Sequence, residues 1–174
     1  EGTAWVEHAL GVPLQPGGQH ARYSTHNRLL ALGPGEYLEV IAPDPVAPRP
    51  KHPIWFGLGQ AGKPRLGNWI VQVGDLAALE RGDLKWRIAV PPDGTLPMGG
   101  AFPTLIEWQG TAAHPSTRLT DQGVRLIGLD ISHPDVAYLT ETIKISMAEP
   151  RIRFHAGPLA LHATFSTPTG ERTL

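Results

Sequence analysis

The chain has 174 residues, a formal net charge of −1, 18% charged residues and no cysteine. This charge balance gives no basic field for nucleic acid and no polybasic anchor, and no apolar run is long enough to cross a bilayer. The lack of cysteine excludes disulfides, thiolate metal sites and cysteine nucleophiles. We therefore expect a cytoplasmic protein that binds neither nucleic acid nor a membrane.

The composition includes 20 Gly and 18 Pro, which favours strands and turns with only short helices. Near the start, apolar residues at helical spacing predict a short helix over 3–10, with Gly11 as its C-cap. Two strands follow at 29–32 and 37–42, and the Gly-Pro-Gly turn between them predicts a hairpin. Residues 43–53 carry five prolines, so they are expected to form an extended connection.

The remaining elements are predicted in two groups. The first group begins with a strand at 67–73 and a helix at 76–81, which Asp75 caps. Two further strands follow, at 86–90 and 103–108. The second group begins with a strand at 124–131. A helix follows, which starts at Ser132 or Asp135 and runs to about 143, and a hairpin of 152–155 with 159–166 closes the group.

The order strand, helix, strands thus occurs more than once, and this repetition predicts an α+β fold built from βαβββ units. We treat the chain as one domain over 1–174, because its length fits a single core. The approximate modules within it are 1–45, 66–110 and 124–170.

Glu39 raises the sharpest question about a site, because it is a carboxylate inside an apolar strand. Alternation along the strand puts Glu39 on one face with Tyr37 and Ile41, and its aliphatic neighbours on the other face. An isolated buried charge is costly, so a Glu39 that faces a cavity is expected to be a metal ligand or a general base. The alternative is a Glu at the rim of the sheet, in water or paired with Arg22 or Arg28.

Glu107 repeats this pattern at the end of the predicted strand 103–108, and Trp108 beside it is placed to wall a pocket. If two modules are related by a pseudo-twofold axis, Glu39 and Glu107 occupy comparable places. The alternative is a structural Glu at a strand end, next to a structural Trp.

Further polar residues flank these strands. His20, His26 and Asn27 precede the strand at 29–32, and His114 follows Glu107 closely. Imidazole and carboxylate ligands suit Zn, Mn, Fe or Ni, and imidazole also serves as a base near neutral pH. We expect these four residues to line a cleft, although the polar loop can also simply satisfy its own backbone.

Three runs of sequence resemble one protein family: THNRLLALGPGEYLEVIAPDP, FPTLIEWQGTAAHPS and LIGLDISHPDVAYL. They are similar to the glyoxalase-like domains of the vicinal-oxygen-chelate superfamily. The resemblance implies βαβββ modules whose curved mixed sheets enclose a cleft, with short helices packed outside. In better-understood members, His and Glu from the strands hold a divalent metal there, which suggests Glu39 and Glu107 as ligands.

The resemblance also implies a function. It suggests a small-molecule enzyme in which a metal polarises adjacent substrate oxygens while a carboxylate moves a proton, as in a lyase, an isomerase or a ring-cleaving oxygenase. The alternative is a metal-free protein that binds or sequesters a small molecule on the same scaffold.

Two further expectations concern completeness and assembly. The first module of such proteins opens with a strand that often supplies a metal-binding His, whereas this chain begins inside the following helix. We expect that strand to lie upstream of Glu1. Members of the superfamily often complete their clefts by pairing modules within or between chains, which suggests a homodimer.

Overall fold

The structure is a computed structural model that describes residues 1–60, 62–73, 86–88, 91–108, 114–143 and 149–174. The helices of this described part are α1 (Gly2–Leu10) and α2 (Val136–Thr142), with short 3-10 turns at Trp55–Gly57, Pro97–Gly100 and Pro115–Thr117. Its strands are β1 (Gln15–His20), β2 (Thr25–Gly33), β3 (Glu36–Pro43), β4 (Ile70–Gln72), β5 (Trp86–Ile88), β6 (Thr104–Trp108), β7 (Arg125–His133), β8 (Ile152–Ala156), β9 (Ala160–Thr167) and β10 (Gly170–Thr173).

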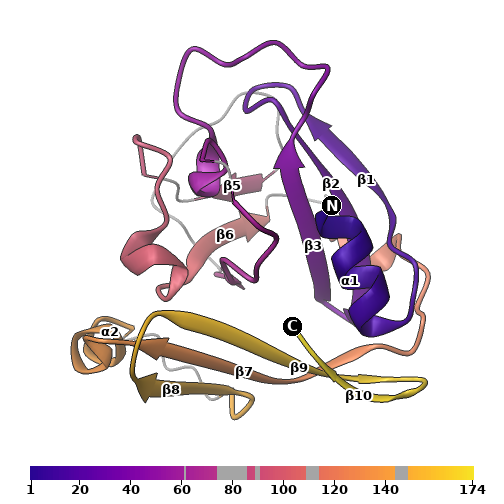
Figure 1. Cartoon of the computed structure of the whole chain (residues 1–174), viewed down its shortest axis with the longest axis vertical. Coiled ribbons are helices and arrows are strands. Elements are labelled where there is room, and N and C mark those ends of the chain that lie inside the picture. Colours follow the sequence, from indigo (N-terminus) through magenta and orange to yellow (C-terminus); the bar gives the residue numbers. More distant parts are fainter. Residues whose placement is uncertain (61, 74–85, 89–90, 109–113, 144–148) are drawn as a thin grey trace.

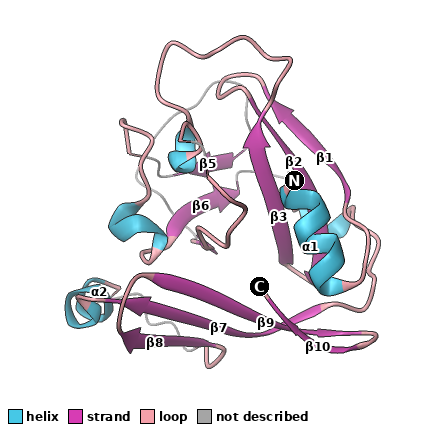
Figure 2. Ribbon diagram, in the orientation of Figure 1, coloured by secondary structure: helices cyan, strands magenta, loops and turns pink. Residues whose placement is uncertain are grey.

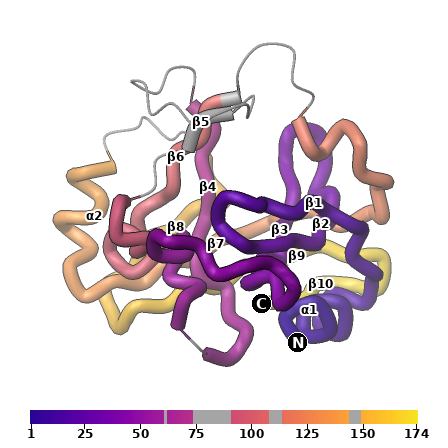
Figure 3. Tube along the Cα trace, turned by 90° about the horizontal axis from the view of Figure 1, so that it is seen from above, coloured from indigo at the N-terminus to yellow at the C-terminus, as the bar shows by residue number. Residues whose placement is uncertain are grey.

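The first helix forms as the sequence predicts. Val6 and Leu10 are buried on its inner face, and Gly11 ends it in the left-handed conformation with φ 71°. Helix α1 lies beside β3 and β10, so the two ends of the chain come near each other in both views (Figures 1 and 3).

The predicted hairpin is confirmed: β2 and β3 pair antiparallel, with Leu29 opposite Glu39. One face of this pair packs Leu30, Leu38 and Val40 into the main core beneath α1. Strand β1 extends the sheet on the other side of β2, in the order β1-β2-β3. The sequence does not predict β1, because its run QPGGQH has neither apolar alternation nor β-branched residues.

The C-terminal sheet has the order β10-β9-β7-β8, in which β7 pairs parallel with β8 and antiparallel with β9. The predicted hairpin of 152–155 with 159–166 is therefore wrong, since β7 lies between its two strands. Helix α2 crosses over from β7 and sets β8 parallel beside it, as parallel pairing requires. The link at 157–159 then crosses two strand spacings, about 10 Å, which a short extended segment can span.

The fold class is α+β, as predicted, with few helices and several antiparallel or mixed sheets (Figure 2). A third sheet has the order β4-β6-β5, with β4 parallel to β6. The repeated βαβββ unit is not established. Chain order and sheet order agree in β1-β2-β3, whereas β7 sits inside its sheet, and the predicted helix at 76–81 lies outside the described residues.

A second, smaller core lies beyond the proline-rich connection. Tyr23, Trp55 and Ile106 are its buried members, and the rings of Tyr23 and Trp55 stack with centroids 4.1 Å apart. The connection itself has neither helix nor strand from 44 to 54, as its prolines predict. Stacking on Tyr23 thus anchors the end of this connection to the turn between β1 and β2.

Within the described part of the chain, no helix combines the length and the apolar character that a membrane span needs.

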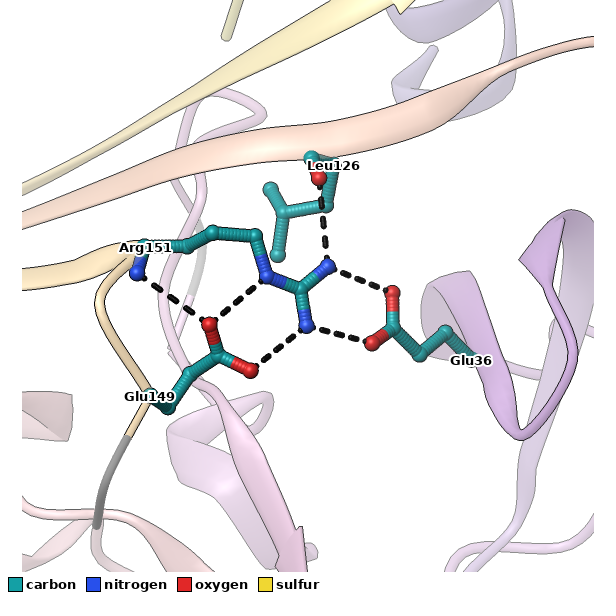
Figure 4. Close-up of polar contacts among 4 residues, drawn as sticks. All are labelled: Glu36, Leu126, Glu149 and Arg151. Carbon is teal, nitrogen blue, oxygen red and sulfur yellow. Dashed lines mark hydrogen bonds and ion pairs between the residues drawn. The ribbon is translucent and has the colours of Figure 1, made fainter.

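Arg151 joins the N-terminal and C-terminal sheets (Figure 4). Its guanidinium donates to both carboxylate oxygens of Glu36, at 3.0 and 2.6 Å, and to both oxygens of Glu149, at 2.8 and 2.7 Å. It also donates to the Leu126 carbonyl oxygen at 3.2 Å. The Arg151 side chain is only 31% exposed, so solvent screens these contacts less than at an open surface.

We predict that Arg151→Met lowers the free energy of unfolding by about 1 to 3 kcal/mol, because two partly buried carboxylates lose their cation. Arg153→Met, two residues further along the chain in β8, is the matched control, since Arg153 pairs with Asp130 at a more exposed position. Urea denaturation at pH 7 would measure both losses. Equal losses in the two variants would contradict a linking role for Arg151.

The same ion pair predicts a pH dependence. Hydrogen bonds from Arg151 lower the pKa of Glu149 from its ordinary 4.5 to about 2. The resulting stabilisation is complete above pH 4.5 and is lost as the pH falls toward 2. We expect the unfolding free energy of Arg151→Met to fall less steeply over that interval than that of the wild type, as measured by urea melts. Parallel curves for the two proteins would argue against the linkage.

Candidate functional site

A cavity of about 1010 Å³ lies between the N-terminal sheet, the segment 56–72 and the C-terminal sheet. Residues from both faces of β3 border it: Glu39 lines it, and so do Leu38 and Val40, which are also partly buried against the main core. Much of the wall is apolar and aromatic, with Phe56, Leu58, Leu66, Trp69 and Ile106 among its members. A space of this size and character suits a small organic molecule.

Glu39 makes one hydrogen bond in the described structure. The amide nitrogen Nδ2 of Asn27 donates to its Oε1 at 2.6 Å. Both residues line the cavity, and alternation on β2 and β3 puts them on the same face of the sheet. Among the described residues, the second carboxylate oxygen of Glu39 has no hydrogen-bond partner, so a ligand in the cavity can engage it.

Burial controls the electrostatics of this face. It raises the pKa of Glu39, and the hydrogen bond from Asn27 opposes that rise only in part. Burial also raises the pKa of Tyr37, and the charge of Glu39 raises it further. The Tyr37 hydroxyl therefore stays protonated near neutral pH, while the carboxyl of Glu39 is better suited to hold a proton than a surface Glu.

His114 lies at the Tyr37 end of the cavity. Its ring meets that of Tyr37 edge-on, with centroids 5.4 Å apart, and its Nδ1 is 2.8 Å from Ser116 Oγ. The Ser116 backbone N–H also points at Nδ1. A backbone N–H can only donate, so Nδ1 is the acceptor and the imidazole proton is on Nε2. Burial lowers the pKa of His114, which favours this neutral form.

The other predicted histidines are placed differently. His26 borders the cavity. His20 is not among the described residues that line the cavity. Its Nδ1 is 3.0 Å from Thr25 Oγ1, and its ring meets that of Trp55 edge-on, with centroids 5.4 Å apart. Burial lowers the pKa of His20, and the nearby charge of His26 lowers it further. The structure thus brings Glu39, Asn27, His26 and His114 to one cavity.

Glu107 is not among the described residues that line this cavity. Its neighbour Ile106 is, and successive side chains of β6 point to opposite faces. The two predicted carboxylates are therefore not brought together in the described structure. Trp108 is part of β6, but its side chain lies outside the described part. The catalytic and ligand roles of these residues stay predictions.

The family of this chain is identified by comparison with known proteins. A family model described as a glyoxalase-like domain matches residues 1–82 and 77–145, which together cover most of the chain. The chain belongs to the glyoxalase-like domain family. The resemblance inferred from three sequence runs is thereby confirmed. Searches of curated proteins and of solved structures found no match.

The metal that the resemblance implies does not fit the donors seen in this glyoxalase-like chain. Across the described residues, no group of three His, Cys, Asp or Glu side chains is placed to hold a metal ion. Asn27 also turns its N–H donors toward Glu39, whereas a cation needs oxygen or nitrogen lone pairs. The described surroundings of Glu39 therefore suit proton transfer better than metal binding.

Several residues that line the cavity are not predicted from the sequence. Phe56 lines it with a strained left-handed backbone, φ 56°, and stacks on Trp55 with ring centroids 4.7 Å apart. Lys63 and Arg65 also line it, and among the described residues neither has an ion-pair partner. No sequence signal marked these three residues, because the fold alone brings the segment after the prolines to β3.

We predict that Glu39→Gln leaves the protein folded and at least as stable as the wild type at pH 8. Because the pKa of Glu39 is raised above its ordinary 4.5, wild-type stability declines as the pH rises from 4.5 through the folded-state pKa. The glutamine variant lacks this decline. Urea melts at pH 4 and pH 8 would show an advantage for the variant that grows with pH, and the exposed Glu171→Gln serves as control. A difference that does not change with pH would refute the burial argument.

Proposed function

We propose that this glyoxalase-like chain is an enzyme that moves a proton on a small substrate, with Glu39 as the general base. The substrate class is a molecule with a C–H bond next to a carbonyl and an apolar or aromatic body. Glu39 would take the proton from carbon, and the bonding electrons would move onto the carbonyl oxygen as an enolate. Return of the proton to a neighbouring atom gives an isomerase, and departure of a leaving group gives a lyase.

The observation that carries this proposal is the partly satisfied carboxyl of Glu39 at the cavity wall. One oxygen accepts from Asn27, and the other has no partner among the described residues. A base is most effective when its pKa lies near the working pH, and burial raises the pKa of Glu39 in that direction. The proposal therefore needs only groups that the cavity contains.

The cavity wall supports the proposed substrate class. Phe56, Trp69 and Ile106 offer apolar and aromatic surface to a substrate body. Lys63 and Arg65 offer cations to a substrate carboxylate. The neutral imidazole of His114 lies in the same cavity and is a candidate to contact the carbonyl oxygen.

This proposal narrows the functions suggested by the sequence. A ring-cleaving oxygenase depends on a metal, and the described donor set does not support that chemistry. The metal-free binding protein remains a second candidate, because a large apolar cavity with one partly satisfied carboxyl also suits tight capture of a small molecule. The homodimer and the cytoplasmic location remain expectations from the sequence.

Proton exchange tests the proposal directly. We expect the protein to speed exchange of the C3 protons of phenylpyruvate for deuterium in D₂O, as followed by proton NMR. Phenylpyruvate combines an aromatic ring, an activated C–H bond and a carboxylate. Glu39→Gln is expected to lower the rate by about 100-fold or more, because it removes the base. Glu171→Gln, an exposed substitution on β10, is expected to retain the wild-type rate.

Other outcomes point elsewhere. Wild-type and Glu39→Gln proteins with equal exchange rates would rule out Glu39 as the base. Phenylpyruvate that raises the melting temperature without exchanging protons would favour the binding protein. Exchange that needs added Mn²⁺ and stops with EDTA would instead make Glu39 a metal ligand.

A further inference from the structure

We infer that Asn27 is a positioning residue for Glu39, and that a glycine bulge in β1 holds Asn27 in place. This inference rests on the proposed function in one respect, that Glu39 acts on the ligand. It adds β1, which contributes no side chain to the chemistry, to the parts of the protein on which the site depends. The residues concerned form a chain of contacts from Gly17 and Gly18 through Asn27 to Glu39.

The first contact fixes which way the Asn27 amide faces. The backbone N–H of Gly18 donates to Asn27 Oδ1 at 2.6 Å. A backbone N–H can only donate, so the amide oxygen must face β1 and the NH₂ group must face away from it. That NH₂ group meets Glu39 Oε1 at 2.6 Å. The backbone of β1 thus selects the donor side of Asn27 for the carboxylate.

The second contact explains why position 17 requires glycine. A Cβ atom at Gly17 would stand 1.9 Å from Asn27 Oδ1 and 2.8 Å from the Asn27 backbone oxygen. No side chain fits there without displacing the amide. At Gly18, by contrast, nothing lies within 4 Å of an added Cβ. Two adjacent glycines therefore differ sharply in their tolerance to alanine.

The bulge supplies the geometry that both contacts need. The pairing of β1 with β2 shifts register between Pro16 and Gln19, so the two glycines leave the regular ladder. This shift turns the N–H of Gly18 toward a side chain rather than toward a strand partner. Bulges of this kind commonly redirect groups near functional sites.

The consequence for Glu39 is a fixed carboxyl. With Oε1 held by Asn27, the free oxygen is presented to the cavity in one orientation, which avoids an entropic cost when the substrate binds. Asn27 acts through Glu39, so its loss is expected to lower kcat more than it raises KM. If Asn27 only supported the fold, its loss would instead reduce stability and leave kcat per folded molecule unchanged.

Gly17→Ala and Gly18→Ala form the matched pair for the test. In ¹H–¹⁵N NMR spectra of the full chain, the side-chain amide of Asn27 should be shifted by its short bonds to Glu39 and Gly18. We expect Gly17→Ala to abolish that shift and Gly18→Ala to keep it. For phenylpyruvate exchange, Gly17→Ala is expected to lower kcat by about 10- to 100-fold, with Gly18→Ala near wild type.

Asn27→Ala provides a second route should Gly17→Ala fail to fold. It is expected to lower kcat by a similar factor, with KM changed less than threefold and the circular dichroism spectrum retained. An unchanged kcat in folded Asn27→Ala, or an unchanged Asn27 signal in Gly17→Ala, would overturn the inference. A wild-type protein without exchange activity would overturn the proposed function instead, and the NMR comparison would still test the contacts.

Discussion

The position of the cavity depends on one guanidinium group. Arg151 immediately precedes β8 of the C-terminal sheet, and its carboxylate partner Glu36 begins β3, three residues before Glu39. All five N–H donors of Arg151 find acceptors. This full set of bonds holds the start of β3 against the C-terminal sheet. It therefore sets the separation of the two sheets that border the cavity. A methionine of similar length would fill the space but would not set that register.

The sequence could predict the elements whose signals are local. The helix at 3–10 has an apolar face and a C-cap glycine, and α2 begins where Asp135 accepts from the backbone N–H of Tyr138. The hairpin of β2 and β3 has alternation on both sides of a glycine turn. In each case, a few neighbouring residues contain all the information that the backbone needs.

Elements that depend on distant partners were missed or misplaced. Strand β1 is polar and rich in glycine, and only its pairing with β2 makes it a strand. The pairing of β7 with β9 brings the buried Ile131 opposite Leu161, and no local pattern records this long-range contact. Lys63 and Arg65 line the cavity through the course of the chain after the proline-rich connection, whose end is held where Trp55 stacks on Tyr23.

The two predicted carboxylates share a pattern of alternation but differ in where the structure places them. Glu39 lies between Leu38 and Val40, which pack partly against the core, so alternation turns Glu39 to the opposite face of β3. The cavity borders all three residues. Glu107 shares its face of β6 with Leu105, and the other face carries the buried Ile106. Both faces of β6 therefore carry an apolar side chain, and the alternation alone does not tell which face turns to the interior. Ile106 is buried in the smaller core and also lines the cavity, so its face of β6 is turned inward, and no pattern within the strand itself records this choice.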